Sequence, residues 1–197
     1  MDNNRLMRIM FYCGLVLASA SCALSPQTIQ ISPLIGAGPT APANNTQLAV
    51  EVRDSRQSEV IGYRGGVYDT ASISTAGDIA ASLQSEITRV YRDLGFQIAE
   101  RDAASDARLV ITVEQLNYTA RQDKLLWTIE VTAVINAEAI TGSRTTSNKI
   151  EDRLSKEFPK SPSVAQNANL INDVISRVLE RIVQDPAMLS ALRTRVQ

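Results

Sequence analysis

The stretch LWTIEVTAVINAEA, residues 126–139, alternates apolar and polar side chains with a period of two. Trp127, Ile129 and Val131 fall on one side of an extended chain, whereas Thr128 and Glu130 fall on the other. Such alternation is typical of a β-strand with one buried face and one solvated face. The stretch therefore predicts a sheet that is covered on one side only.

Further stretches predict partners for this strand. Residues 48–52 and 108–118 alternate in the same way. Residues 144–154 are more polar, which suits an edge strand, and residues 28–32 are compatible with a short added strand at a sheet edge. We therefore expect a mainly antiparallel β-sheet with a wet face and a dry face.

Two segments carry apolar residues at the helical period and predict amphipathic helices, residues 75–94 and residues 164–184. Gly95 is placed to form a left-handed cap after the first helix, and Asp185-Pro186 predicts the start of a short C-terminal helix. One economical arrangement buries both stripes against the dry face. It is an α+β two-layer sandwich, in the order β-α-β-β-β-α plus the short helix, with the two long helices on one face.

The N-terminal residues have the order of a bacterial export signal. Arg5 and Arg8 precede the mostly apolar residues 9–20, and small residues then lead to Cys22. The apolar run is shorter than the roughly 20 residues that a membrane-spanning helix needs. We therefore expect residues 1–21 to be a signal peptide.

Cys22 resembles the lipidated cysteine of a lipobox, in which the acylated cysteine becomes the mature N-terminus. Ser19 departs from that pattern, because leucine usually stands three residues before the cysteine. The alternative is ordinary cleavage after Ala20 or Ser21, which gives a soluble periplasmic or secreted protein. Ala23 follows, where aspartate would indicate retention at the inner membrane, so we expect the periplasmic face of the outer membrane.

Proline and glycine are frequent between residue 22 and residue 46, which predicts a lipidated N-terminus and a flexible tether. Extended at about 3.3 Å per residue, such a tether would hold the domain some tens of Å from the membrane. Residues 47–197 are expected to form a single globular domain. Cys13 would leave with the signal, so Cys22 would have no cysteine in the chain with which to form a disulfide.

The composition excludes several classes of function. The chain has no histidine, which rules out Ser-His-Asp and Cys-His catalysis and all histidine-containing metal sites. Its formal net charge of −1 supplies no basic excess for binding nucleic acid. We expect no catalytic residues, no metal site and no cofactor other than the covalent lipid.

The loop after residues 48–52 is the best candidate for a binding site. Its glycines permit close approach of a ligand, and Arg56 and Arg64 can form paired hydrogen bonds to a carboxylate or phosphate. The alternative, which we favour, is that Asp54 pairs with one arginine and fastens the loop to the helix layer. The predicted ligand- or partner-binding residues are Asp54, Arg56, Gly62, Arg64, Gly65, Gly66 and Tyr68.

The order of these features resembles the YajG-type bacterial lipoproteins. The likeness comprises the signal with its cysteine, the strand at 48–52, Asp54-x-Arg56, the motif GYRGGVY at 62–68 and the helix that ends at Gly95. It implies an outer-membrane-anchored periplasmic protein and leaves the biochemical role open.

The function expected from these observations is that of a lipid-anchored, non-catalytic binding or scaffold module. Its partners would be the membrane, through the anchor, and an envelope protein or cell-wall component. One alternative is an accessory lipoprotein of a lipid or lipopolysaccharide transport system, which requires an apolar groove between sheet and helices. A less favoured alternative is a carboxylate-dependent envelope hydrolase, which requires two acidic residues about 5–10 Å apart in a cleft.

Overall fold

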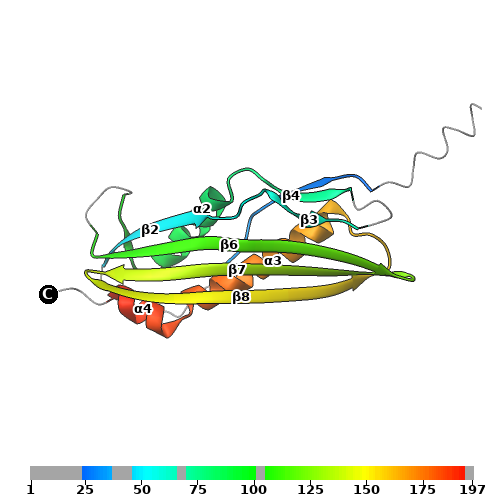
Figure 1. The fold of residues 1–197 in the computed structure, drawn as a ribbon. Coiled ribbons are helices and arrows are strands. Elements are labelled where there is room, and N and C mark those ends of the chain that lie inside the picture. The colour runs from blue at the N-terminus through cyan, green and yellow to red at the C-terminus, as the bar shows by residue number, and fades with distance from the viewer. Residues whose placement is uncertain (1–23, 37–45, 66–69, 101–104, 194–197) are drawn as a thin grey trace, which may run out of the picture.

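The computed structural model describes residues 24–36, 46–65, 70–100 and 105–193. Within these residues it has three helices and one mixed sheet of eight strands (Figure 1). In chain order the elements are β1 (Gln27–Gln30), β2 (Gln47–Asp54), β3 (Val60–Tyr63), β4 (Ser72–Ala76), α2 (Ile79–Asp93), β5 (Gln97–Ile98), β6 (Ala107–Asp123), β7 (Leu126–Thr141), β8 (Arg144–Phe158), α3 (Val164–Val183) and α4 (Pro186–Arg193).

The long meander β6-β7-β8 forms one side of the sheet, with β8 at the edge, and confirms the strand predicted from residues 126–139. Both pairings in it are antiparallel. The buried face carries pairs such as Ile135 with Ile150 and Trp127 with Phe158, while Glu130 pairs with Ser155 on the opposite face. One face of the meander is therefore dry, as its alternation indicates.

The sheet as a whole is mixed, which corrects the expectation of a mainly antiparallel sheet. β2 and β3 both run parallel to β6 along the same edge, and β1 runs parallel to β4. α2 lies in the connection from β2 to β6, and such crossovers join parallel strands. Alternation along a strand reports its faces and carries no information on its direction, so the sequence pattern could not distinguish the two arrangements.

The chain segment that links β2 to β3 leaves the edge of β6 at a β-bulge between Val113 and Gln115. Both the backbone N–H and the hydroxyl of Ser55 donate to the Val113 carbonyl oxygen, at 3.0 and 2.9 Å. β3 then rejoins the same edge at Tyr118. One long strand thus supports two short ones in series.

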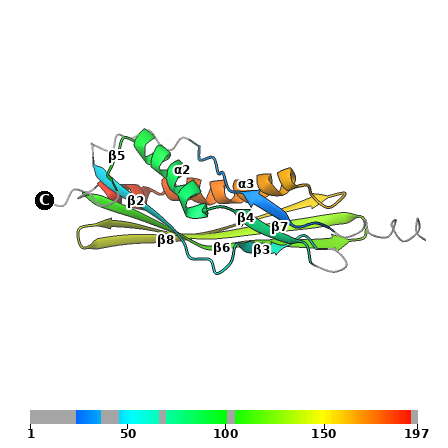
Figure 2. The same ribbon diagram turned by 90° about the horizontal axis from the view of Figure 1, so that it is seen from above.

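The helices lie on one face of the sheet, as expected (Figure 2). α2 begins at Ile79, because residues 72–76 form β4 and Asp78 is the N-cap, accepting from the Ala81 N–H at 3.0 Å. Gly95 has a φ of 88°, which confirms the predicted left-handed cap. Asp185 accepts from the first N–H groups of α4, as the Asp185-Pro186 sequence predicts.

Residues 24–36 belong to the globular domain, which shortens the predicted tether. β1 pairs with β4, and Ile29, Ile31 and Ile35 are buried. Side chains of α2 and α3 accept hydrogen bonds from the backbone of the following segment: Asn172 from Ser32, Ser176 from Leu34, Glu86 from Ile35 and Glu180 from Gly36. Proline content marked these residues as non-helical, and the buried isoleucines place them on the domain.

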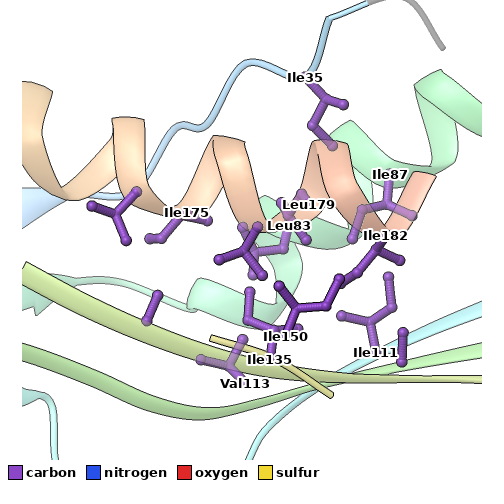
Figure 3. Close-up of a cluster of buried hydrophobic side chains, with 14 of the residues drawn as sticks. Ile35, Leu83, Ile87, Ile111, Val113, Ile135, Ile150, Ile175, Leu179 and Ile182 are labelled. Carbon is purple, nitrogen blue, oxygen red and sulfur yellow. The ribbon is translucent and has the colours of Figure 1, made fainter. Parts of the chain in front are cut away.

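Aliphatic side chains fill the space between the sheet and the helices. Figure 3 shows Leu83 and Ile87 from α2 and Leu179 and Ile182 from α3 directed toward the sheet residues Ile111, Ile135 and Ile150. All seven side chains are at most 5% exposed. Burial of each contributes roughly 1.5–3 kcal/mol before entropy is subtracted, so this layer supplies much of the stability.

Candidate functional site

Asp54 and Arg56 form a fastening at the start of the predicted binding loop. The Nε of Arg56 donates to one carboxylate oxygen of Asp54 at 2.9 Å, and its Nη2 donates to the other at 2.7 Å. Nη2 also donates to the hydroxyl of Thr75 in β4 at 3.3 Å. The Arg56 side chain is only 6% exposed, so the pair ties the end of β2 to β4.

The pKa of the Asp54 carboxyl lies below its ordinary value. Burial alone would raise this pKa, but the side-chain and backbone hydrogen bonds from Arg56 favour the ionised form and outweigh it. The carboxylate is therefore a charged partner of the fold at neutral pH. This arrangement fits the expected pairing of Asp54 with an arginine rather than the capture of an external anion. The pair fastens the loop to strand β4 and not to the helix layer, which corrects that part of the expectation.

The two described glycines of the loop serve the packing of the chain. Gly62 lies opposite Tyr118 in the pairing of β3 with β6, and Gly65 has a φ of 73°. A Cβ atom at Gly65 would lie 3.1 Å from the Trp127 ring and 3.2 Å from the Ala120 carbonyl oxygen. Glycine is needed here because the backbone passes close to its neighbours.

Arg64 is 8% exposed and joins three segments that are far apart in the sequence. Its Nη1 donates to the Ser25 carbonyl at 2.8 Å, and its Nη2 donates to the Ser161 hydroxyl at 3.2 Å and the Pro162 carbonyl at 3.1 Å. The Gln27 amide oxygen faces the Nε and Nη2 of Arg64 at 3.2 and 3.1 Å, in the orientation that gives these donors an acceptor. We call these five residues the Arg64 cluster.

The Arg64 cluster continues into a buried polar network. Gln27 and Asn167 lie 2.8 Å apart through their amide groups, and Asn167 hydrogen-bonds the Tyr118 hydroxyl at 3.1 Å. Burial lowers the pKa of Arg64 and raises that of Tyr118 to about 12, so the tyrosine is neutral at physiological pH. The network therefore holds β1, β6 and α3 together.

The structure does not bring Arg56 and Arg64 onto one common ligand position, because each is hydrogen-bonded to a different part of the fold. Asp54, Arg56, Gly62, Arg64 and Gly65 all have structural contacts. Gly66, Tyr68 and Cys22 lie outside the described residues. A ligand-binding role for the loop stays a prediction.

An open hollow of about 340 Å³ lies between the edge strand β8 and helix α3. It is lined by Leu154, Lys156, Phe158, Gln166, Asn169, Leu170 and Asp173. Among the described strands, β8 pairs with β7 alone, so its other edge borders the hollow. The sequence signal for the hollow is the pair Leu154 and Phe158 at the end of a mostly polar strand that also carries Ile150. This signal could not be interpreted without knowing where α3 lies.

The two alternative functions make different demands on the described residues. Core side chains fill the layer between the sheet and the middle of the helices, and the hollow between β8 and α3 is the apolar opening that the transport alternative would have to use. Asp173 is the one carboxylate among the described residues that line the hollow, and glycoside hydrolysis by two acids needs a second. In the part of the chain that the structure describes, no group of three or more acidic or cysteine side chains is placed to hold a metal ion.

The comparison with protein families gives a match over residues 37–193, to the Lipoprotein_16 family, described as uncharacterized lipoprotein. The chain belongs to this family. This match confirms the resemblance of the lipoprotein to the YajG-type proteins. None of the helices described in it is both long and apolar enough to cross a membrane. The comparison with curated proteins finds no match.

One solved structure with a TM-score above 0.5 shares the fold of this lipoprotein. Protein XCC0632 from Xanthomonas campestris is 19% identical, with a TM-score of 0.59 over 84% of this chain and 95% of its own. A putative neuraminyllactose-binding hemagglutinin homolog from Helicobacter pylori, 9% identical, has a TM-score of 0.42 over 82% of this chain and 96% of its own. Lipoprotein GNA1162 from Neisseria meningitidis, 10% identical, has a TM-score of 0.35 over 70% and 97%. The first likeness shows the fold alone, and the other two are too distant to bear on either fold or function.

Proposed function

We propose that this lipoprotein is anchored by an acylated Cys22 to the periplasmic face of the outer membrane and acts there as a non-catalytic binding or scaffold module. The observation that carries the proposal is the position of Cys22, directly after a basic, apolar and small-residue segment, in a chain that belongs to a lipoprotein family. Each buried methylene contributes about 0.8 kcal/mol, so two or more acyl chains anchor a protein stably.

Fractionation of cells tests the anchor. In Cys22→Ala the protein is expected to move from the outer-membrane fraction to the soluble periplasm. Cys13→Ala is the matched control, because it removes a cysteine from the expected signal peptide and leaves the acylation site intact. Membrane association that is unchanged in Cys22→Ala would contradict the proposed anchor.

The hollow between β8 and α3 is the better-supported binding surface. Arg56 and Arg64 are both engaged in hydrogen bonds within the fold, whereas the hollow offers an apolar floor beside the open edge of a strand. Leu154, Phe158 and Leu170 supply that floor, and charged and amide side chains surround it. Such a site suits an envelope partner that presents an extended segment along β8 and an apolar side chain to the hollow.

Photo-crosslinking in intact cells distinguishes the hollow from the loop. A crosslinking residue at position 169 samples the hollow, one at position 63 samples the loop, and one at position 117 samples the opposite, wet face. We expect a crosslinked envelope component from position 169. A product from position 63 alone would assign binding to the loop, and no product from any position would contradict a binding role.

A further inference from the structure

We propose that the tip of the β6–β7 hairpin, residues 121–126, is a second membrane contact that inserts into the surface of the phospholipid bilayer holding the lipid anchor. The proposal rests on the proposed acylation of Cys22. It adds a protein surface that touches lipid directly and so fixes the orientation of the domain.

The hairpin tip exposes apolar side chains without a partner in the fold. Leu125 is 83% exposed and Leu126 is 44% exposed. Two further exposed apolar residues, Tyr63 and Val164, adjoin the Arg64 cluster in sequence. Four of the six large apolar residues that are exposed in the described chain are therefore in or near this part of the molecule. Transfer of a leucine side chain from water to the acyl region of a bilayer lowers its free energy, and tyrosine is favoured at the membrane interface.

The Arg64 cluster places the start of the described chain at the same end as the tip. Arg64 holds the Ser25 carbonyl at 2.8 Å, and its neighbour Gly65 lies against Ala120 and Trp127, which are three residues and one residue from the ends of β6 and β7 at the tip. Figures 1 and 2 agree that the first residues of β1 and the β6–β7 tip point toward one end of the molecule, opposite to α4.

Chain geometry brings that end to the membrane. Three peptide units separate Cys22 from Ser25, so the anchor lies at most about 11 Å from the Ser25 position. The strand β6 advances three residues from Ala120 to Asp123, about 10 Å at the rise of a β-strand, before the turn at Lys124 and Leu125. The advance of the hairpin is therefore similar to the reach of the anchor, and residues 24–36 are packed on the domain and add no slack. The tip and the anchor can thus meet the same membrane surface.

The charges of the tip suit a phospholipid surface. Arg121 and Lys124 are exposed on either side of Asp123, and long basic side chains hold their charge in the headgroup layer while their stems lie deeper. A bilayer is also the surface that an acyl chain at residue 22 would bring closest. A free protein partner would have to displace that bilayer to reach the leucines.

Depth-dependent fluorescence quenching tests the contact in the full lipidated protein. Leu125→Cys is labelled with an environment-sensitive fluorophore and reconstituted into vesicles of phosphatidylethanolamine and phosphatidylglycerol that carry nitroxide lipids. Leu34→Cys is the matched control, because Leu34 is similarly exposed, at 78%, but lies beside Ser176 in the middle of α3. Lipid occupies the Cys22 thiol in this preparation, so the introduced cysteine is the reactive one. The mass of the N-terminal peptide is measured on the same sample.

We expect a blue shift and at least twofold quenching at position 125, with neither at position 34. Acyl mass on Cys22 together with an unquenched probe at position 125 would overturn the tip contact and leave the anchor standing. An N-terminal peptide without acyl mass would overturn both. The probe could also be shielded from solvent in cells and yet remain unquenched in vesicles that contain no protein other than this one. That result would assign the tip to a protein partner and overturn the lipid assignment.

Discussion

Gly62 lies so close to Tyr118 that a Cβ atom at Gly62 would stand 1.9 Å from the Tyr118 carbonyl oxygen. These two residues form the register pair that joins β3 to β6 in parallel. The glycine therefore allows the two backbones to approach, and the approach positions Arg64 two residues further along the chain. A single position thus links the sheet to the buried cluster that holds the N-terminal segment.

Gly62→Ala is expected to destabilise the protein by about 1–3 kcal/mol, because the backbone of β6 cannot move away without breaking its pairing with β7. Urea unfolding monitored by circular dichroism measures the loss. Gly77→Ala is the control: φ is 64° there, and no atom lies within 4 Å of the added carbon, so its cost is limited to backbone strain. Equal stability of Gly62→Ala and the native protein would show that β3 is not fixed on β6.

The sequence predicts which face of each strand and helix is buried. It does not predict which strands lie next to one another in the sheet. The period of two in residues 126–139 and the helical stripe beginning at Ile79 correspond to buried faces in the structure. The parallel pairing of β2 and β3 with β6 depends on a crossover and a bulge, which the alternation does not encode. Asp54 and Arg56 are two residues apart, so their ion pair could be predicted from the sequence. The partners of Arg64 lie in distant segments and could not be predicted, because the sequence does not show which segments meet.

Asp54→Asn is expected to lower stability at pH 7 by roughly 1–3 kcal/mol, because the buried guanidinium of Arg56 loses its charged partner. The hydrogen bonds from Arg56 outweigh burial and depress the pKa of Asp54 in the folded state. The pair therefore stabilises the fold above the ordinary carboxyl pKa of about 4, and this contribution is lost as the pH falls through the folded pKa. Urea unfolding of both proteins between pH 7 and pH 3 should show the difference narrowing.

The exposed pair of Asp93 with Arg89 is the control for this experiment. Its atoms are 2.9 Å apart, but the side chains are 64% and 49% exposed. Asp93→Asn should change stability by no more than about 0.5 kcal/mol, because solvent screens surface ion pairs. If Asp54→Asn were equally mild, the Asp54–Arg56 fastening would be dispensable and the loop would be open to another role.

Arg64→Met is expected to loosen the N-terminal segment, since the Ser25 and Pro162 carbonyls lose their donor. Hydrogen exchange should become at least about tenfold faster for the amides of residues 27–31, a change that corresponds to about 1.4 kcal/mol of lost protection. Arg64→Lys should give an intermediate result, because one ammonium group cannot reproduce the fork of a guanidinium. Unchanged protection in Arg64→Met would mean that β1 is held by its pairing with β4 alone.

Ile31→Ala and Leu34→Ala compare a buried and an exposed residue in the same N-terminal segment. Ile31 is 1% exposed and Leu34 is 78% exposed. If residues 24–36 are part of the core, Ile31→Ala should lower the free energy of unfolding by about 2–5 kcal/mol. Leu34→Ala should alter it by less than about 0.5 kcal/mol. If residues 24–36 were instead a flexible tether, neither substitution would change the temperature of thermal unfolding. That result would also contradict the proposed hairpin contact, because a flexible tether would let the domain lie far from the membrane.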